Sequence, residues 1–411
     1  MKDPLEEASP GTRRGVAGAA LILLFGLVLL AVVRPGTRDT LAIILGIVVL
    51  IMAHEAGHYL AAKRSGMKVT EFFLGFGPRI WSFKRGETEY GVKAIPAGGY
   101  VRIIGMNNLE EVAPEDEGRT YREATFGRRL VTVLAGVTVN ILIAIVLFFF
   151  VFMGRGVSDG LSTTLDEVLA DTPAARAGLE AGDRVLSIGD EPIDDWDEVS
   201  EALEDRAGDP TRFVVERDGE RMTLTVTPER RSPTDGRGYV GIAPDEAFRS
   251  VGVIGAARES VATIGEGTVE LGRGLAGFFS PSGLSEYSEN FTESPNGGSG
   301  SGGTVDTERP RGIIGIVDIG GDLVDGDLWR LLSLLAVVNL IVALFNLLPL
   351  LPFDGGHAAI ACYEQVVSKI RGREVRVDYA KLMPMTAVVL VVFLTLGVSV
   401  AFLDLRDIFA G

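Results

Sequence analysis

The stretch that organises this chain is Ile51-Met52-Ala53-His54-Glu55-Ala56-Gly57-His58-Tyr59-Leu60, which lies inside a hydrophobic segment. On a helix, His54 and His58 lie one turn apart on the same face, so both imidazoles can bind one Zn²⁺. Glu55 is displaced around the helix, near enough to take a proton from a water at the metal. This H-E-x-x-H pattern is typical of zinc peptidases. Ordinary core histidines are the alternative, but ionisable groups in lipid-like sequence are costly unless they serve a function.

The composition predicts a membrane protein. The 411 residues, 47% of them hydrophobic, exceed one ordinary domain. Apolar stretches long enough to span a bilayer occur at Gly15–Val33, Leu41–Ala62, Leu130–Gly154, Leu331–Phe353 and Leu382–Leu403. The first is long for a cleaved signal peptide and lacks a small-residue cleavage site, so a retained helix is favoured. We therefore expect an α-helical polytopic membrane protein of about five spans, with one soluble insert between the third and fourth spans.

The charge of the chain limits its partners and its metal chemistry. The net charge is −16, and the segment Arg155–Asp245 holds 22 Asp and Glu against 10 Arg. No lysine occurs from Ala94 to Ser368. Such an acidic surface argues against binding nucleic acid. The single cysteine, Cys362, excludes an internal disulfide and a cysteine-rich zinc site, so His and carboxylate side chains must hold the metal.

Basic residues near the spans predict the orientation of the chain in the membrane. The loop Lys63–Arg129 contains 12 Lys and Arg, Lys369–Lys381 contains 5, and Arg34–Thr40 contains 2. The positive-inside rule then places the first two of these loops in the cytoplasm. The acidic insert would lie outside the cell. Because His58 is only a few residues from Lys63, the metal site is expected toward the cytoplasmic side.

A third zinc ligand is expected at the end of the fourth span, since catalytic zinc usually has three protein ligands and an open fourth position. The sequence there is Asn346-Leu347-Leu348-Pro349-Leu350-Leu351-Pro352-Phe353-Asp354-Gly355-Gly356-His357. Its prolines and glycines break the helix, and such backbone is tolerated at membrane depth only where it is buried or lines a cavity. One span separates the two segments, so they run in the same direction and Asp354 can meet the histidines. A simple span terminus, with Asp354 facing the cytosol, is the alternative.

Two soluble-looking regions flank the third span. After the second span, strand-like pieces Ile80–Lys84, Thr88–Ile95 and Tyr100–Ile104 are joined by turns, the last at Pro96–Gly99. This region is either a hairpin on the membrane surface or a sheet dipping toward the active centre. In the second case its edge pairs with an unwound substrate, which makes Gly98 and Gly99 substrate-binding candidates.

The insert, about Gly160 to Arg231, is predicted to be a compact α/β module. Helices are expected at 173–179 and 196–205, and a strand at 182–188. A hairpin around Asp218-Gly219 joins 213–217 to 221–227. Beyond the insert, Val253–Phe279 is expected to be a helix lying on the membrane. Ser280–Arg309 has the composition of a flexible linker.

The chain resembles the site-2 proteases, a family of intramembrane zinc metalloproteases. The resemblance covers most of residues 41–403 and is carried by His54-Glu55-x-x-His58, Phe76-Gly77-Pro78, Ile95-Pro96-Ala97-Gly98-Gly99-Tyr100 and Asn346…Pro349…Asp354-Gly355. It implies that His54, His58 and Asp354 bind zinc and that Glu55 is the catalytic glutamate. The chain departs from the family pattern at Leu351, Phe353 and Val137.

The insert is similar to the family's circularly permuted PDZ domain. That resemblance implies a peptide-binding loop after the hairpin, formed by Gly238-Tyr239-Val240-Gly241-Ile242, with Tyr239, Val240, Gly241 and Ile242 as contacts for peptide C-termini.

The predicted domains are an N-terminal tail with an extra transmembrane helix (1–40), the first half of a protease core (41–154), a PDZ-like domain (155–247), an amphipathic segment with a linker (248–330) and the second half of the core (331–411). The predicted function is hydrolysis of transmembrane segments of membrane-protein substrates in the cell membrane, with one zinc ion per chain. Asn346 or Asn140 is expected to stabilise the oxyanion, and the sequence does not choose between them. The alternative is a non-catalytic scaffold or metal-handling protein with a peptide-binding module.

Overall fold

The computed structural model describes residues 35–230, 238–278, 280–283, 285, 324 and 326–410. The predicted span Gly15–Val33 and most of the predicted linker lie outside these residues. The chain divides into two compact units. Unit 1 comprises Met1–Val151 with Ala257–Gly411, and unit 2 comprises Phe152–Ala256.

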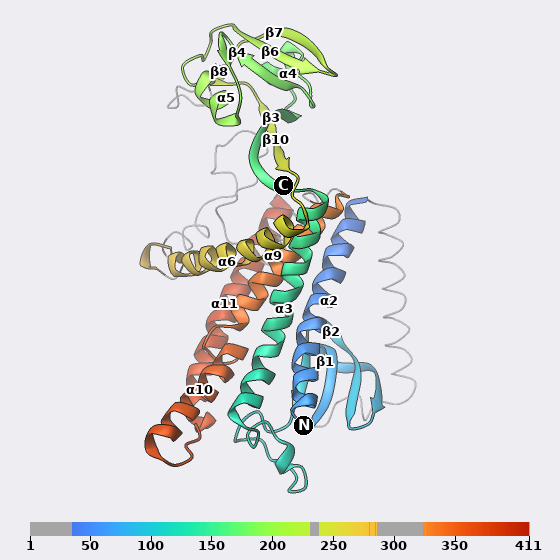
Figure 1. The fold of residues 1–411 in the computed structure, drawn as a ribbon, viewed down its shortest axis with the longest axis vertical. Coiled ribbons are helices and arrows are strands. Elements are labelled where there is room, and N and C mark those ends of the chain that lie inside the picture. The colour runs from blue at the N-terminus through green and yellow to red at the C-terminus, as the bar shows by residue number, and fades with distance from the viewer. Residues whose placement is uncertain are drawn as a thin grey trace. The chain divides into compact units, whose positions relative to one another are not determined.

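Unit 1 is built on long apolar helices (Figure 1). They are α2 (Pro35–Arg64), α3 (Phe126–Gly154), α9 (Leu328–Asn346) and α11 (Tyr379–Ala410). Within the described part of the chain, 4 helices are long and apolar enough to cross a membrane. Helices are suited to the hydrocarbon core of a bilayer because they satisfy their backbone hydrogen bonds internally. These helices correspond to four of the predicted spans.

The predicted fourth span is too long at its C-terminal end. Helix α9 ends at Asn346, and the following residues to Phe353 form turns before α10 (Asp354–Arg371) begins. The two prolines account for this break, because neither can donate the backbone hydrogen bond that a continuing helix requires. The break places Asp354 in the first turn of α10.

Two long strands, β1 (Val69–Arg85) and β2 (Thr88–Ile103), follow α2. They are longer than expected, since residues 71–78 belong to β1. Leu74 pairs with both Val92 and Gly99, so β2 doubles back and its two segments flank the same part of β1. Gly75 and Gly77 have φ of 85° and 80°, which allows β1 to bulge and bend there. The predicted turn at Pro96–Gly99 is the bend within β2.

An ion-pair cluster connects the end of α2 to this hairpin. Glu87, in the turn between the strands, accepts hydrogen bonds from Arg119 Nη1 at 2.7 Å and Nη2 at 2.9 Å and pairs with Lys63. Arg119 belongs to the short helix η1 (Glu117–Arg119). Hydrogen bonds from Arg119 and then Lys63 lower the pKa of Glu87 to about 2. The carboxylate therefore stays ionised and holds the three segments together.

Unit 2 contains an antiparallel sheet with strand order β10-β3-β4-β6-β7, and the short strand β5 pairs with β4. Its strands are β3 (Val157–Val168), β4 (Arg184–Ile188), β5 (Glu191–Pro192), β6 (Thr211–Arg217), β7 (Glu220–Val226) and β10 (Ile242–Arg249). Helices α4 (Pro173–Ala177) and α5 (Trp196–Leu203) accompany it, and β8 (Glu229–Arg230) pairs with β9 (Gly238–Tyr239). The apolar core is centred on Phe213, Val215 and Ile188.

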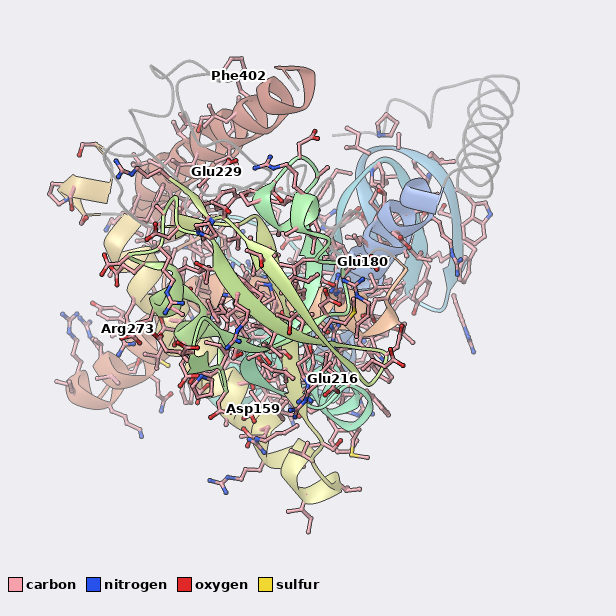
Figure 2. The ribbon with its side chains drawn as sticks, turned by 90° about the horizontal axis from the view of Figure 1, so that it is seen from above. Asp159, Glu180, Glu216, Glu229, Arg273 and Phe402 are labelled. Atoms are coloured by element: carbon pink, nitrogen blue, oxygen red, sulfur yellow. The ribbon has the colours of Figure 1, made fainter. Side chains whose placement is uncertain are left out.

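Local sequence patterns in unit 2 predict its elements well. The hairpin turn has φ of 51° at Asp218 and 82° at Gly219, as a type I′ turn requires. Thr172 caps α4, whose C-terminal cap Gly178 is left-handed at φ 87°. The side chains of Asp159, Glu180 and Glu229 are 62%, 65% and 59% exposed, and they are labelled together with Glu216 in Figure 2. Helix α6 (Val253–Phe278) follows, as predicted.

Candidate active site

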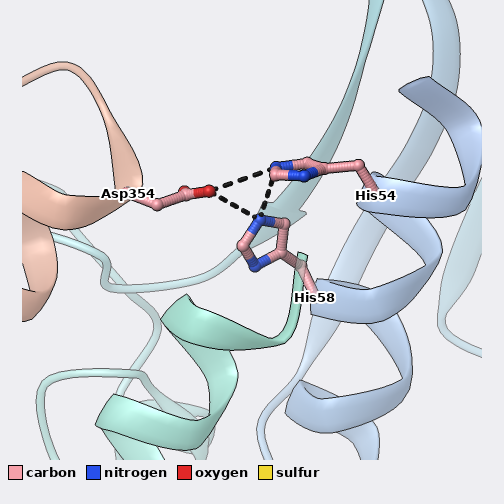
Figure 3. Close-up of side chains that lie close together, drawn as sticks. All are labelled: His54, His58 and Asp354. Carbon is pink, nitrogen blue, oxygen red and sulfur yellow. Dashed lines mark hydrogen bonds and ion pairs between the residues drawn. The ribbon is translucent and has the colours of Figure 1, made fainter. Parts of the chain in front are cut away.

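Two helices far apart in sequence bring the candidate metal ligands together (Figure 3). His54 Nε2 and His58 Nε2 lie 3.1 Å apart on α2. Asp354 Oδ2, from the first turn of α10, lies 3.1 Å from each of them. Both imidazoles are buried. The histidines of α2 and the start of α10 therefore meet, as expected for two spans that run in the same direction.

Glycine residues allow α10 to begin where it does. A Cβ atom on Gly356 would lie 2.6 Å from the backbone nitrogen of Leu351, a distance that real Cβ atoms do not adopt. Gly355 is similarly close to the carbonyl of Leu347. The Gly355-Gly356 pair thus lets the helix pack against the turn that precedes it, which fixes the position of Asp354.

Helix α3 orients the histidines from the other side. His58 Nδ1 donates a hydrogen bond to the carbonyl of Thr132 at 2.8 Å, since a carbonyl oxygen can only accept. The lone pair of His58 is therefore on Nε2, which faces His54 and Asp354. A Cβ atom on Gly136 would lie 2.7 Å from His54 Nε2. Neither the role of Thr132 nor the need for glycine at 136 is predicted by the sequence pattern. The only signal was a small-residue pair, Ala135-Gly136, within a span.

The three donor atoms fit a zinc ion. Two imidazole nitrogens and one carboxylate oxygen are a normal donor set for catalytic zinc. Donors about 2.0–2.1 Å from a tetrahedral metal lie about 3.3–3.4 Å from one another. The observed separations of 3.1 Å are close to that value. Asp354 Oδ2 and the lone pair of His58 Nε2 converge with His54 Nε2 at one point, and a cation bound there would take all three as ligands.

Glu55 lies where α2 meets the hairpin. A Cβ atom on Gly99 would lie 3.2 Å from Glu55 Cγ and 2.9 Å from the sulfur of Met52, so this part of β2 packs directly on the helix. The backbone of Val101 is also close to the Glu55 carboxylate. Gly98 adopts φ 136° and lies beside the ring of Phe76. Of the two predicted substrate-binding glycines, Gly99 is thus a neighbour of the candidate base.

The two candidate asparagines have different surroundings. Asn346 Nδ2 donates to the carbonyl of Val342 in its own helix at 3.1 Å. Asn140 is fully buried on α3, one turn beyond Gly136, and neither amide atom of its side chain has a hydrogen-bond partner among the described residues. Asn339, which no sequence pattern singles out, donates to the backbone oxygen of Asn140 at 2.6 Å.

The remaining candidates, Tyr239, Val240, Gly241 and Ile242, belong to unit 2. The side chain of Val240 is 2% exposed and lies in the core of that unit. The carbonyls of Val240 and Gly241 accept hydrogen bonds from the backbone of Ala174 and Leu169. In this predicted loop, Tyr239 and Ile242 keep partly exposed side chains.

A His-His-Asp cluster beside a glutamate on a membrane-length helix defines the class of the protein, an intramembrane metallopeptidase. The model of peptidase family M50 matches residues 42–394. Zinc metalloprotease Rip1 of Mycobacterium tuberculosis is 36% identical over 385 residues, covering 84% of this chain and 92% of that protein. Rip1 of Mycolicibacterium smegmatis is 35% identical, covering 85% and 92%. A putative zinc metalloprotease of Rhizobium meliloti is 30% identical, covering 79% and 86%.

The chain therefore belongs to peptidase family M50. This membership confirms the resemblance to site-2 proteases and the prediction of a zinc-dependent protease. It does not favour the alternative of a non-catalytic scaffold or metal-handling protein.

Proposed function

We propose that this protein cleaves membrane-anchored substrates within the bilayer, with His54, His58 and Asp354 holding one zinc ion and Glu55 as the general base. The observation that carries this assignment is the 3.1 Å approach of Asp354 Oδ2 to both histidine Nε2 atoms across about 300 residues of sequence. Nothing local in the chain requires that approach, so it is best explained by a shared ligand.

Zinc supplies a Lewis acid that makes water more acidic and polarises a peptide carbonyl. Glu55 takes a proton from water and passes it to the leaving amine. Glu55 lies beside Gly99, and its side chain is only partly exposed. Asn140 is the favoured donor to the developing oxyanion, because its amide has no partner among the described residues, whereas Asn346 donates within α9.

The substrate has to be extended at the cleavage site, since a transmembrane helix hides its carbonyls in its own hydrogen bonds. The segment of β2 from Gly99 to Ile103 is suited to hold it. A groove of about 510 Å³ runs along Tyr100–Ile103 and is bounded by Met106 and Leu109. An added strand on this edge would bring its carbonyls next to Glu55.

The same proposal includes the orientation and the role of unit 2. The basic loops Lys63–Arg129 and Lys369–Lys381 favour a metal site toward the cytoplasm, with unit 2 as a PDZ-like domain outside the cell. Residues Tyr239–Ile242 would then recognise peptide C-termini through backbone N–H groups.

Replacing Glu55 with Gln tests the assignment of the base. The amide cannot accept a proton, so cleavage of a reporter transmembrane peptide is expected to fall about 10²–10⁴-fold. Zinc measured by elemental analysis should remain at one ion per chain, because Glu55 is not a ligand. Glu111→Gln, at an exposed carboxylate, is the matched control and should keep normal turnover. Near-normal turnover in Glu55→Gln would contradict the mechanism.

A further inference from the structure

A cavity of about 530 Å³ lies between α10 and the beginning of α11. We call it the α10–α11 pocket. Most of its wall is aliphatic or aromatic, with Leu351, Ile360, Tyr363, Leu382 and Met385 among the lining residues. The size and the apolar wall are typical of a site for a small amphipathic molecule. None of the candidate catalytic residues lines it.

The charged residues that line the pocket are two cations, Arg376 and Lys381, and one anion, Asp378. Lys381 lines the pocket with a side chain that is 83% exposed, and its ion pair with Asp378 is long, at 3.9 Å. Arg376 also lines it but is engaged by Glu123 at 3.0 Å and Glu374 at 2.8 Å. The segment Lys369–Lys381 as a whole has 5 basic residues against 2 acidic ones. Lys381 is therefore the cation best placed for an anionic ligand.

The surroundings of the pocket indicate that the ligand comes from the membrane. Lys381 stands in the first turn of an apolar span, Tyr379–Leu403, and so at the level of an interface. On α10, Tyr363, Val366 and Ile370 are 54%, 55% and 78% exposed, and their spacing places them on one helical face. An exposed apolar face beside basic residues is the arrangement of a helix lying in the headgroup region.

We propose that the α10–α11 pocket binds an anionic phospholipid. Its acyl chain lies against Ile360, Leu382 and Met385, and its phosphate lies at Lys381. Charge complementarity selects an anionic over a zwitterionic headgroup, because the surrounding segment is net positive. The apolar wall selects a lipid over free phosphate. The proposal does not depend on the protease assignment, since no zinc ligand takes part.

Lipid binding to the full-length purified protein in detergent tests the proposal. Native mass spectrometry during titration with phosphatidylglycerol or phosphatidylcholine gives the affinity for each. Phosphatidylglycerol should bind more tightly, and Lys381→Gln should weaken it about fivefold while leaving phosphatidylcholine unchanged. Lys369→Gln is the matched control, because it removes the same charge from the same segment but does not line the pocket. A second variant, Ala359→Trp, fills the pocket and should weaken both lipids.

Four outcomes would overturn the proposal. Equal affinity for the two lipids would remove the charge selection. An equal loss in Lys369→Gln and Lys381→Gln would show general surface attraction rather than a site. Displacement of the bound lipid by glycerol phosphate would assign the site to free phosphate esters, and displacement by the reporter transmembrane peptide would assign it to substrate.

Discussion

Gly136 illustrates how little space the metal site leaves at the level of single residues. Its position on α3 faces both imidazoles, and a Cβ atom there would lie 2.7 Å from His54 Nε2. Helix α3 can orient His58 through the Thr132 carbonyl only because no side chain intervenes. The close approach is therefore part of the site.

Gly136→Ala is expected to displace the histidines and reduce both zinc content and activity by at least about tenfold, since ligand geometry is held by such supporting contacts. Gly127→Ala is the matched control on the same helix, because nothing lies within 4 Å of a Cβ atom there. Zinc per chain and turnover of the reporter peptide are measured for both. Normal zinc content in Gly136→Ala would show that α3 adjusts at no cost.

Asp354→Asn tests the third ligand. A neutral amide binds zinc more weakly than a carboxylate, so the variant should lose zinc to a competing chelator at lower chelator concentration and should be inactive. The zinc affinity is obtained from that competition. Full zinc occupancy with normal activity would exclude Asp354 as a ligand.

At the scale of elements, a buried ion pair joins α3 to α10. Arg129 Nη1 donates to Glu364 Oε2 at 2.6 Å, and their side chains are 12% and 8% exposed. The other carboxylate oxygen accepts the backbone N–H of Val377 at 2.7 Å. The pair connects the helix that orients His58 to the helix that begins with Asp354. It therefore stabilises the arrangement of the two halves of the core.

Removing one partner leaves the other charge buried and unpaired, which costs about 3–5 kcal/mol. Arg129→Met should lower the free energy of unfolding by roughly that amount, measured by denaturant titration in detergent. Arg129→Met combined with Glu364→Met should recover much of the loss, except for about 1–3 kcal/mol from the unpaired N–H of Val377. Arg128→Met, at the exposed neighbouring position, should have little effect. If Arg128→Met destabilised the protein as much as Arg129→Met, the Arg129–Glu364 pair would have no specific role.

These elements also show what the sequence could predict. The spacing of His54, Glu55 and His58 within one helix and the Asp218-Gly219 turn are local patterns, and both were predicted. Asp354 was identified because prolines and glycines interrupt an apolar span. The Arg129–Glu364 pair joins residues 235 positions apart, and no local pattern connects them. The Thr132 contact uses a backbone carbonyl, which every residue has, so its role depends on helix packing alone.

At the scale of the whole molecule, unit 2 is an insertion with adjacent ends. Val157 pairs with Arg249 and Ser158 pairs with Phe248, so the chain enters and leaves the unit through neighbouring strands. Such an insertion can be gained or lost without interrupting the protease core. Its acidic surface and its proposed peptide loop suit either a filter that admits only trimmed substrates or a simple spacer.

The filter hypothesis predicts that removing unit 2 abolishes discrimination by substrate size. Because Leu161 pairs with Glu246, deleting residues 162–245 and joining the strands with Asn-Gly should leave a closed two-residue hairpin. The intact protein should cleave a short transmembrane reporter faster than the same reporter carrying a folded domain on the side of unit 2. The deletion variant should cleave both at similar rates, because the bulky unit no longer excludes the folded domain. The short reporter is the internal control for an intact active site. If the deletion variant keeps the preference for the short reporter, unit 2 is a spacer and the exclusion arises within the membrane core.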